Sequence, residues 1–312
     1  MLNGHMIDPR LRTLRVLQQE GTVTAAADVL HLTPSTVSQQ LRGLAKDLGV
    51  QLLEAQGRRV RLTPAAYTVL DHADALCSQW ERAQADLAEH RRGGFGQVRF
   101  AAVSSALAAL VTPAAARLRE EHPRLTVRMA EEESEKVFSL LLARRTDIAV
   151  VIPTADGPPP DDPRFDQRPL LDEPQDLLVA PDHPLAGGGA VRLADAAREP
   201  WIGSPGRPDQ HQVMITACAA AGFTPRIAHH ANDWFAVSAM VAEGFGIAIV
   251  PRLAPLPPGD QVVRVPLRGE PVPSRRIITC VRWGSDRQPP IAHGLEALRR
   301  AAAERRARGR PR

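Results

Sequence analysis

The hydrophobic pattern at the start of the chain predicts short helices with clear ends. Apolar side chains recur every three or four positions over residues 9–20, which is the spacing of one helix face. Gly21 is a typical C-terminal stop, because glycine adopts the left-handed conformation without strain. Thr22 is a good N-cap for a second helix that reaches Leu30.

A third helix and a β-hairpin are expected next. Thr33 is the N-cap, proline occupies the first helical position, and Gly49 ends the helix. Segment 50–62 has β-forming residues at both ends and a polar centre, which suits a small wing. The third helix should bury a single apolar stripe. Its members are Val37, Leu41, Leu44 and Leu48.

A change of period marks the next helix, expected from residue 63 to about residue 90. Its apolar positions follow alternating steps of three and four, which is typical of a coiled-coil seam. A helix lying on its own domain is the alternative, but the sustained register favours pairing with a second copy. The sequence GGFG at 93–96 then supplies a hinge. The seam consists of Ala66, Val69, Ala73, Leu76, Trp80, Ala83 and Leu87.

Strands and helices alternate from residue 97 onward. QVRFAAV, LTVRMAE and DIAVVIP are predicted strands with helices between them, so a βαβαβ unit with a parallel sheet is expected. A second set follows a proline-rich loop and includes DLLVAP, PWIGS, GIAIVP and RRIITCVRW, with a last helix near Gly294. Two such α/β lobes indicate a cleft between them, where small molecules commonly bind.

Net charge adds little to this picture. The chain carries +4, but residues 299–312 carry +6 and residues 1–62 carry +3, which leaves −5 between them. The Arg-rich segment 299–312 is expected to be a disordered tail, so overall basicity is weak evidence for DNA binding. No apolar run approaches the ~20 residues of a spanning helix, and the N-terminus has no secretory signal. We therefore expect a soluble, cytoplasmic protein without a membrane partner.

Cysteine spacing does not indicate a metal site. Cys77, Cys218 and Cys280 lie far apart, with no CxxC or Cys/His ligand pattern. A redox switch is the alternative to three unremarkable reduced thiols, which we favour. No metal and no cofactor are predicted.

The outward face of the third helix is rich in small hydroxyls and amides. An ordinary solvated face would carry more Glu, Lys and Arg, which are better helix formers. Hydroxyls can approach phosphates closely, while Gln39 and Arg42 can hydrogen-bond base edges in the major groove. With the preceding helix and turn, this predicts a helix-turn-helix; a solvated helix in a small bundle is the alternative. The outward positions are Ser35, Thr36, Ser38, Gln39 and Arg42.

This region resembles the LysR-type transcriptional regulators. The resemblance is carried by GTVTAAADVLHLTPSTVSQQLRGLAKDLGVQLLEAQGRRVRLTPAA at 21–66. TDIAVV at 146–151, HPLA at 183–186, PWIGS at 200–204 and VAEGFGIAIVP at 241–251 are similar to the family's effector-domain landmarks, so nearly the whole chain is covered. The resemblance implies an α+β multidomain protein with a winged helix-turn-helix, a dimerising linker helix and a two-lobed α/β effector domain like a periplasmic binding protein.

The expected domains and partners follow from this resemblance and the pattern. The domains are a DNA-binding domain at 1–65, a linker helix at 66–92, an effector domain at 93–298 and the tail at 299–312. The partners are a double-stranded DNA operator with an inverted repeat, a small-molecule effector of unknown identity, and further copies of the chain. The family implies tetramers, which the sequence itself does not show.

The predicted wing departs from the family in its charge. Ala55 stands where many members have arginine, which removes one cation. Arg58, Arg59 and Arg61 remain, and they are expected to contact phosphate or the minor groove, although a solvated loop would explain them equally well. The predicted DNA-binding residues are Thr22, Thr24, Thr33, Ser35, Thr36, Ser38, Gln39, Arg42, Arg58 and Arg59.

Small polar residues after predicted strands are the candidates for the effector site. Where a strand meets the next helix, free backbone N–H groups favour an anionic group. Ser104 and Ser105 stand there in the first lobe, Gly203 and Ser204 in the second, and Asn232 is expected to face the same cleft. The serines could equally be helix caps. An acidic run, more simply a solvated loop than an amine site, contains Glu131, Glu132, Glu133 and Glu135.

Two other functions would fit an α/β scaffold. An enzyme is disfavoured because the sequence has no Gly-rich phosphate loop, GxSxG elbow or HExxH motif. An extracytoplasmic solute-binding protein would have the two lobes but not the N-terminal DNA-binding module. We therefore expect a non-enzymatic regulator.

Overall fold

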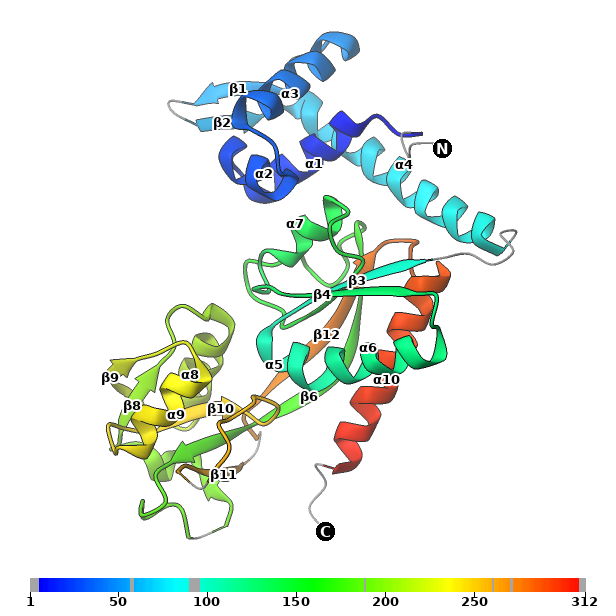
Figure 1. The fold of residues 1–312 in the computed structure, drawn as a ribbon. Coiled ribbons are helices and arrows are strands. Elements are labelled where there is room, and N and C mark those ends of the chain that lie inside the picture. Colours follow the sequence, from blue (N-terminus) through cyan, green and yellow to red (C-terminus); the bar gives the residue numbers. More distant parts are fainter. Residues whose placement is uncertain are drawn as a thin grey trace.

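The computed structural model has four parts, of which the first lobe is built from two separate segments of the chain. Figure 1 shows a small helical domain with a two-stranded hairpin, a long helix, and two α/β lobes. No helix among the described residues is both long and apolar enough to cross a membrane. The structure describes residues 6–56, 59–89, 96–187, 189–259, 261–269 and 272–308.

The first two helices have the ends that the sequence predicts. α1 (Pro9–Glu20) stops at Gly21, which is left-handed with φ of 72°. α2 (Val23–Leu30) begins after Thr22, whose hydroxyl accepts a hydrogen bond from the Ala25 amide at 3.2 Å. Local chemistry alone therefore sets this part of the backbone.

The third helix and the hairpin are also confirmed. α3 (Pro34–Leu48) has Thr33 as its N-cap and a left-handed Gly49 after its last residue. β1 (Leu53–Gln56) and β2 (Arg59–Leu62) pair in antiparallel register. Together these elements form a winged helix-turn-helix.

The prediction that all four residues of the apolar stripe of α3 are buried is wrong for one of them. Val37, Leu41 and Leu44 are at most 3% exposed, whereas Leu48 is 46% exposed. Every residue at positions 46–50 is exposed, so this end of α3 projects past the core. Helical spacing alone cannot show where the covering helices end.

The long helix α4 (Pro64–Glu89) divides the predicted seam into two halves. Ala66 is fully buried in the core of the N-terminal domain. Leu76 and Leu87, farther along, are 54% and 50% exposed. The seam thus packs on its own chain at one end and leaves large apolar side chains uncovered at the other.

Lobe I, defined here as residues 96–174 and 274–308, contains the predicted βαβαβ unit. Its elements are β3 (Gln97–Ala102), α5 (Ser104–Ala106), a π-helical segment (Leu107–Val111), α6 (Thr112–Glu121), β4 (Thr126–Glu131), α7 (Val137–Leu142), β5 (Ile148–Val151), β12 (Ser274–Arg282) and α10 (Pro289–Arg308). β3 pairs in parallel with both β4 and β5. α7 packs against α1, and the Arg145 guanidinium donates to the Val29 carbonyl at 3.0 Å, so lobe I contacts the N-terminal domain.

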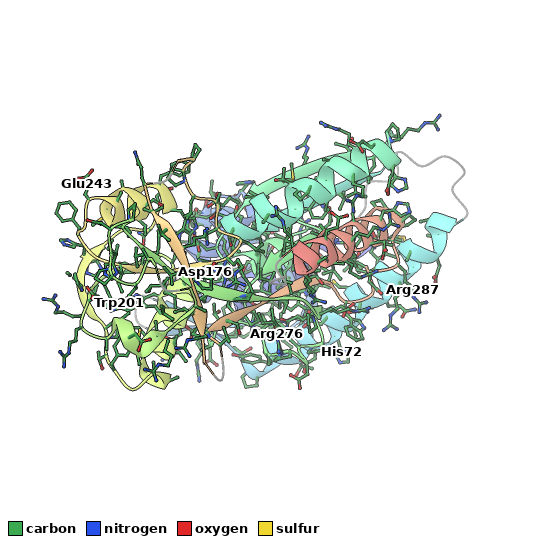
Figure 2. All side chains as sticks on the ribbon, turned by 90° about the horizontal axis from the view of Figure 1, so that it is seen from below. His72, Asp176, Trp201, Glu243, Arg276 and Arg287 are labelled. Carbon is green, nitrogen blue, oxygen red and sulfur yellow. The ribbon has the colours of Figure 1, made fainter. Side chains whose placement is uncertain are left out.

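Lobe II, residues 175–273, has its own core. Its elements are β7 (Val191–Arg192), a 3₁₀ helix (Leu193–Ala196), β8 (Pro200–Gly203), α8 (Pro208–Ala220), β9 (Arg226–His230), α9 (Trp234–Ala242), β10 (Ala248–Pro251) and β11 (Val263–Arg268). Trp201 on β8 is completely buried in this core (Figure 2). The second α/β set of the sequence pattern is therefore confirmed, except that RRIITCVRW and the last helix belong to lobe I, where β12 pairs with β5 and α10 packs on the same core.

A strand shared by both lobes was only half predicted. β6 (Phe165–Val179) pairs with β12 through residues 165–174 and with β10 and β11 through residues 175–179. The pattern predicted only DLLVAP, because the first half of β6 contains proline and several polar residues. β6 and β12 run between the lobes (Figure 1), in a sheet of order β4-β3-β5-β12-β6-β11-β7.

The prediction of a disordered tail at 299–312 is wrong for residues 299–308, which are helical. α10 continues to Arg308, and Ala301 and Ala302 are 3% and 2% exposed. Small apolar residues between the arginines extend one packed face of the helix, which a count of charges does not reveal. Residues 309–312 lie outside the described residues.

Candidate functional site

The helix α3 presents a polar face away from the domain core. Ser35, Gln39 and Arg42 are exposed, while Val37 and Leu41 are buried on the opposite side. This arrangement leaves one amide and one guanidinium with the reach to hydrogen-bond base edges. Both were predicted as base contacts.

The hydroxyls at the start of α3 bond to one another. The Thr33 hydroxyl accepts from the Thr36 amide at 3.2 Å and lies 2.8 Å from both the Ser35 and Thr36 hydroxyls. Thr36 and Ser38 are only half-exposed. Thr33 therefore serves first as the helix cap, and Ser35 is the hydroxyl of this group most open to a phosphate.

A neighbouring amide is turned inward. Gln40 accepts a hydrogen bond from the Thr13 hydroxyl at 2.6 Å, which joins α3 to α1. Adjacent glutamines thus have different surroundings, with Gln39 facing solvent. At the start of α2, Thr22 and Thr24 are also exposed.

The wing supplies less free charge than the sequence indicates. The Arg61 guanidinium lies 2.7 Å from the Glu54 carboxylate, its partner across the hairpin. Arg58 lies outside the described residues, as does the side chain of Arg59. Among the described wing residues, the remaining cation is therefore already paired.

The predicted effector residues of lobe I both accept from arginines that the sequence did not single out. Ser105, 2% exposed, accepts from Arg275 at 2.6 Å. Ser104 accepts from Arg207 of lobe II at 3.1 Å. These contacts join residues far apart in the sequence, so no local pattern could have revealed them.

Arg275 is buried where the two lobes meet. Its guanidinium lies 2.7 Å from Glu173, and it donates to the Gln210 side-chain oxygen at 3.2 Å. Gln210 belongs to α8 in lobe II, whereas Ser105 belongs to lobe I. Figure 2 labels Arg276, the exposed neighbour of Arg275 on β12.

Arg207 lies between an aromatic ring and the other lobe. Its guanidinium stacks over Trp234 at 4.9 Å from the ring centre and forms no ion pair among the described side chains. Trp234 is 4% exposed, and its buried indole N–H has no hydrogen-bond partner among the described residues. The Arg207 cation therefore lies against the Trp234 ring and bonds to Ser104 of the other lobe.

The predicted residues of lobe II are close to this group. Ser204 is 7% exposed, and Gly203 is also buried. The Asn232 side chain accepts from the Gly206 amide at 2.9 Å, which fixes the turn before Arg207. Asn232 thus supports the loop that carries Arg207.

The acidic run faces the same loop. Burial and the nearby Asp209 raise the pKa of the Glu133 carboxyl, although Arg207 opposes this effect. Glu133 is nevertheless exposed, so the acidic run keeps its interpretation as a solvated loop, here one that lies near Arg207.

A cavity of about 610 Å³ lies beside the junction of the lobes. It is bounded by Thr154 of lobe I and by Val213 and Ala217 of α8, with Arg192 and Arg268 at its rim. None of the five predicted effector residues lines it. Glu135 of the acidic run does line it, as does Asp209, whereas its apolar wall on α8 resembles an ordinary helix face and was not identified from the sequence.

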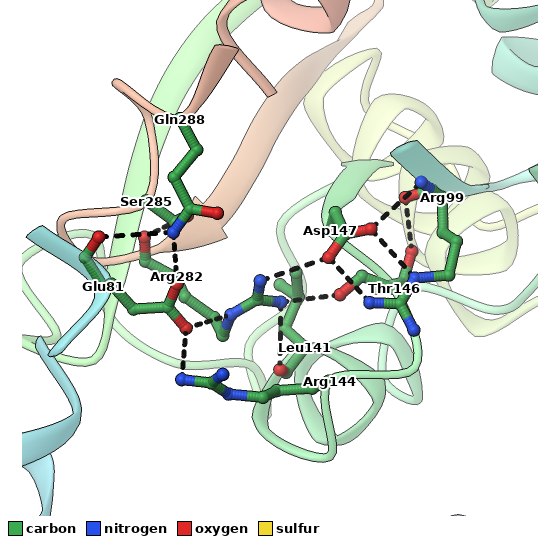
Figure 3. Close-up of polar contacts among 9 residues, drawn as sticks. All are labelled: Glu81, Arg99, Leu141, Arg144, Thr146, Asp147, Arg282, Ser285 and Gln288. Atoms are coloured by element: carbon green, nitrogen blue, oxygen red, sulfur yellow. Dashed lines mark hydrogen bonds and ion pairs between the residues drawn. The ribbon is translucent and has the colours of Figure 1, made fainter. Parts of the chain in front are cut away.

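A buried carboxylate attaches the linker helix to lobe I. Glu81 on α4 is 2% exposed and lies 2.7 Å from Arg282 and 3.0 Å from Arg144 (Figure 3). Burial alone would raise the pKa of Glu81, but the two arginines hold it below its usual value. Glu81 was not among the predicted site residues, because it is one of the polar residues of α4 that lie between the seam positions.

Two of the three cysteines do not resemble reactive thiols. Cys218 and Cys280 are fully buried. Burial raises the pKa of Cys218 to about 12 and that of Cys280 well above its usual value. Protonated thiols are poor nucleophiles, so these two positions give no support to a redox switch.

Family models match both parts of the chain. The model for the bacterial regulatory helix-turn-helix protein, lysR family, matches residues 9–67. The model for the LysR substrate binding domain matches residues 91–303.

Individual relatives are similar over most of their length. The small neutral protease regulatory protein of Streptomyces coelicolor is 30% identical over 274 residues, 86% of this chain and 84% of that protein. The RuBisCO operon transcriptional regulator of Allochromatium vinosum is 27% identical over 247 residues, 79% of this chain and 80% of that protein. A full-length OxyR variant from Pseudomonas aeruginosa has the same fold, with a TM-score of 0.65 at 21% identity, covering 95% of this chain and 96% of that one.

Proposed function

Because the chain belongs to the LysR family of transcriptional regulators, a family of non-enzymatic DNA-binding proteins with an effector-binding domain, we propose that α3 reads an interrupted inverted-repeat operator. The single observation that supports this most is the exposed face of Ser35, Gln39 and Arg42 above a buried apolar stripe. The proposed site of action is the cytoplasm, where the operator is accessible.

The operator is best found by selection in vitro. The full-length protein would be incubated with a random pool of DNA duplexes, and the bound duplexes sequenced over several rounds. We expect two related half-sites separated by about one DNA turn, ~34 Å, or a multiple of it. Recovery of duplexes with no shared sequence would overturn the proposal.

The assembly that would bind such an operator is a dimer formed through α4. Leu76 and Leu87 are half-exposed, and Trp80 between them is partly buried. A second copy would cover this surface, and further pairing would give a tetramer. Trp80→Glu places a charge in the seam, and we expect sedimentation to give a smaller species at low concentration. Gln79→Glu adds the same charge at an exposed neighbouring position and should leave the oligomer unchanged.

We also propose that a small molecule binds in the inter-lobe cleft near Ser104, Ser204 and Arg207. Arg207, which forms no ion pair among the described side chains and reaches Ser104 of the other lobe, supports an anionic group on this ligand. A thermal-shift screen of metabolites would be repeated on Ser104→Ala and Ser204→Ala. A metabolite that stabilises the wild type and both variants equally would show that it binds elsewhere.

A further inference from the structure

The strand β12 carries a buried arginine near each end. Arg275 is its second residue and Arg282 its last, and they are 6% and 7% exposed. Seven steps along a strand span roughly 23 Å, at about 3.3 Å for each residue. Each arginine needs several hydrogen-bond partners in the interior, and different parts of the molecule supply them.

The partners of Arg275 come from both lobes. Ser105 belongs to lobe I, Gln210 belongs to α8 of lobe II, and Glu173 belongs to the shared strand β6. Any rotation of lobe II against lobe I must change the Gln210 contact or move the arginine with it. Arg275 is thus sensitive to how the cleft is closed.

The partners of Arg282 connect lobe I with the linker helix. Its guanidinium bonds to Glu81 of α4 at 2.7 Å, to Asp147 at 3.1 Å and to the Thr146 carbonyl at 2.7 Å (Figure 3). Gln288 donates to the second Glu81 oxygen at 2.7 Å. Glu81 is therefore held by lobe I alone, through groups gathered around the end of β12.

The strand between the two arginines is paired and buried. β12 pairs with β6 over its whole length, with one register shift between Ile277 and Ile278, and it pairs with β5 over residues 278–281. All residues at 277–281 are at most 7% exposed, with Ile277 and Val281 in one core and Ile278 and Cys280 in another. Close-packed interiors transmit displacements because they compress little.

We propose that β12 is the element that couples the inter-lobe cleft to the linker helix, with Arg275 as its input and the Arg282–Glu81 pair as its output. The inference rests on the proposed function, since an effector in the cleft is what would move Arg275. Closure of the lobes changes the position of β12, and Glu81 passes that change to α4 and so to the recognition helices. Glu81 is a positioning residue here, because it touches neither DNA nor effector.

Amide hydrogen exchange of the full-length protein tests this coupling without DNA or ligand. Arg275→Gln disturbs the cleft end of β12, and its matched control is Arg276→Gln at the exposed neighbouring position. We expect Arg275→Gln to change exchange in α4 around Glu81 by roughly fivefold or more, the lower end of common coupling energies. Arg276→Gln should leave α4 unchanged.

The reverse perturbation starts at the linker helix. Glu81→Gln should change exchange around Ser105 and in α8, whereas Asp71→Asn, which removes a charge from an exposed position of the same helix, should not. If Arg275→Gln fails to fold, Ser105→Ala weakens the same end and is expected to act in the same direction. Exchange changes confined to the mutated end in all folded variants would overturn the coupling, because spatial connection alone does not establish it.

A second readout uses an operator selected from the random duplex pool. Ser105→Ala should alter operator affinity in the wild-type background but not in the Glu81→Gln background. Equal effects in both backgrounds would overturn the coupling through Glu81. If no operator is recovered, the proposed function fails, and the exchange measurements still decide whether β12 couples the two ends.

Discussion

The DNA-reading surface and the effector domain hold their charged groups in opposite ways. On α3, Gln39 and Arg42 extend into solvent, where salt screens their interactions and water competes for their hydrogen bonds. In the effector domain, Arg275 and Arg282 are buried, and each is bonded to a carboxylate and to neutral groups. The first arrangement suits contact with a partner that arrives from water. The second fixes the position of one element relative to another, and it should be costly to break.

Two adjacent ion pairs between β12 and β6, one buried and one exposed, should show the largest difference in stability on mutation. The Arg275–Glu173 side chains are 4% and 1% exposed, whereas those of Arg276–Asp172 are 62% and 69% exposed. Glu173→Ala removes the close partner of a buried cation and leaves only the Asp209 carboxylate, at 3.9 Å, so we expect about 3–5 kcal/mol loss of unfolding free energy. Asp172→Ala should cost at most about 1 kcal/mol. Urea denaturation at neutral pH measures both, and equal losses would contradict the distinction.

A pair of adjacent glutamines sharpens the comparison at the DNA-reading surface. Gln39→Ala should weaken discrimination between matched and mismatched operators by about 1–3 kcal/mol while leaving stability unchanged. Gln40→Ala should instead lower stability by about 1 kcal/mol, because the Thr13 hydroxyl loses its partner. Operator titrations and urea denaturation of both variants separate the two effects. A Gln39→Ala protein with full affinity and specificity would remove this residue from the DNA contacts.

Lowering the pH should destabilise the buried ion pairs of Asp147 with Arg99 and Arg282 before it affects the polar face of α3. Burial would raise the pKa of Asp147, but Arg99 and Arg282 overcome that effect and lower it from 3.8. A carboxylate with a lowered pKa adds stability above its unfolded value, and that stability is lost as the pH falls through the folded value. Asp147→Asn should therefore be less stable near neutrality and lose less stability below a pH of about 4. Urea midpoints measured across this range, with Asp172→Asn as the exposed control, test the prediction.

The smallest expected effect is that of Arg42 on the salt dependence of operator affinity. If Arg42 releases a counterion from DNA on binding, Arg42→Ala should reduce the slope of log affinity against log salt concentration by about 1. The Arg61–Glu54 pair is already formed in the wing, so Arg61→Ala should change that slope less. Titrations with the selected operator at several salt concentrations distinguish the two arginines.

Local chemistry explains which parts of the fold were predictable. Thr22, Thr33, Gly21 and Gly49 act on backbone groups within a few residues, so sequence spacing alone located the ends of the first three helices. The exposure of Leu48 was not predictable in this way, because it depends on where the neighbouring helices stop. The same limit applies to the end of α10, whose packing depends on residues distant in the sequence.

The effector region was predictable only in outline. Ser104 and Ser105 were identified because strand ends and helix starts are visible in the sequence. Arg207 and Arg275 were missed because they meet those serines across 103 and 170 residues of chain. Nothing near either arginine in the sequence sets it apart from the many exposed arginines of this protein. The fold brings these two arginines to the serines, and no local sequence pattern marks them.

The place of β12 in the sheet has a consequence for how the protein is made on the ribosome. β12 lies between β5 and β6, yet its residues 274–282 are translated long after both neighbours. Until they emerge, the edges of β5 and of the first half of β6 have no strand between them, while the N-terminal domain is already complete. Unpaired edges of this kind invite association with other chains. A message truncated before codon 274 would therefore yield a product able to present α3 but prone to aggregate through the open sheet.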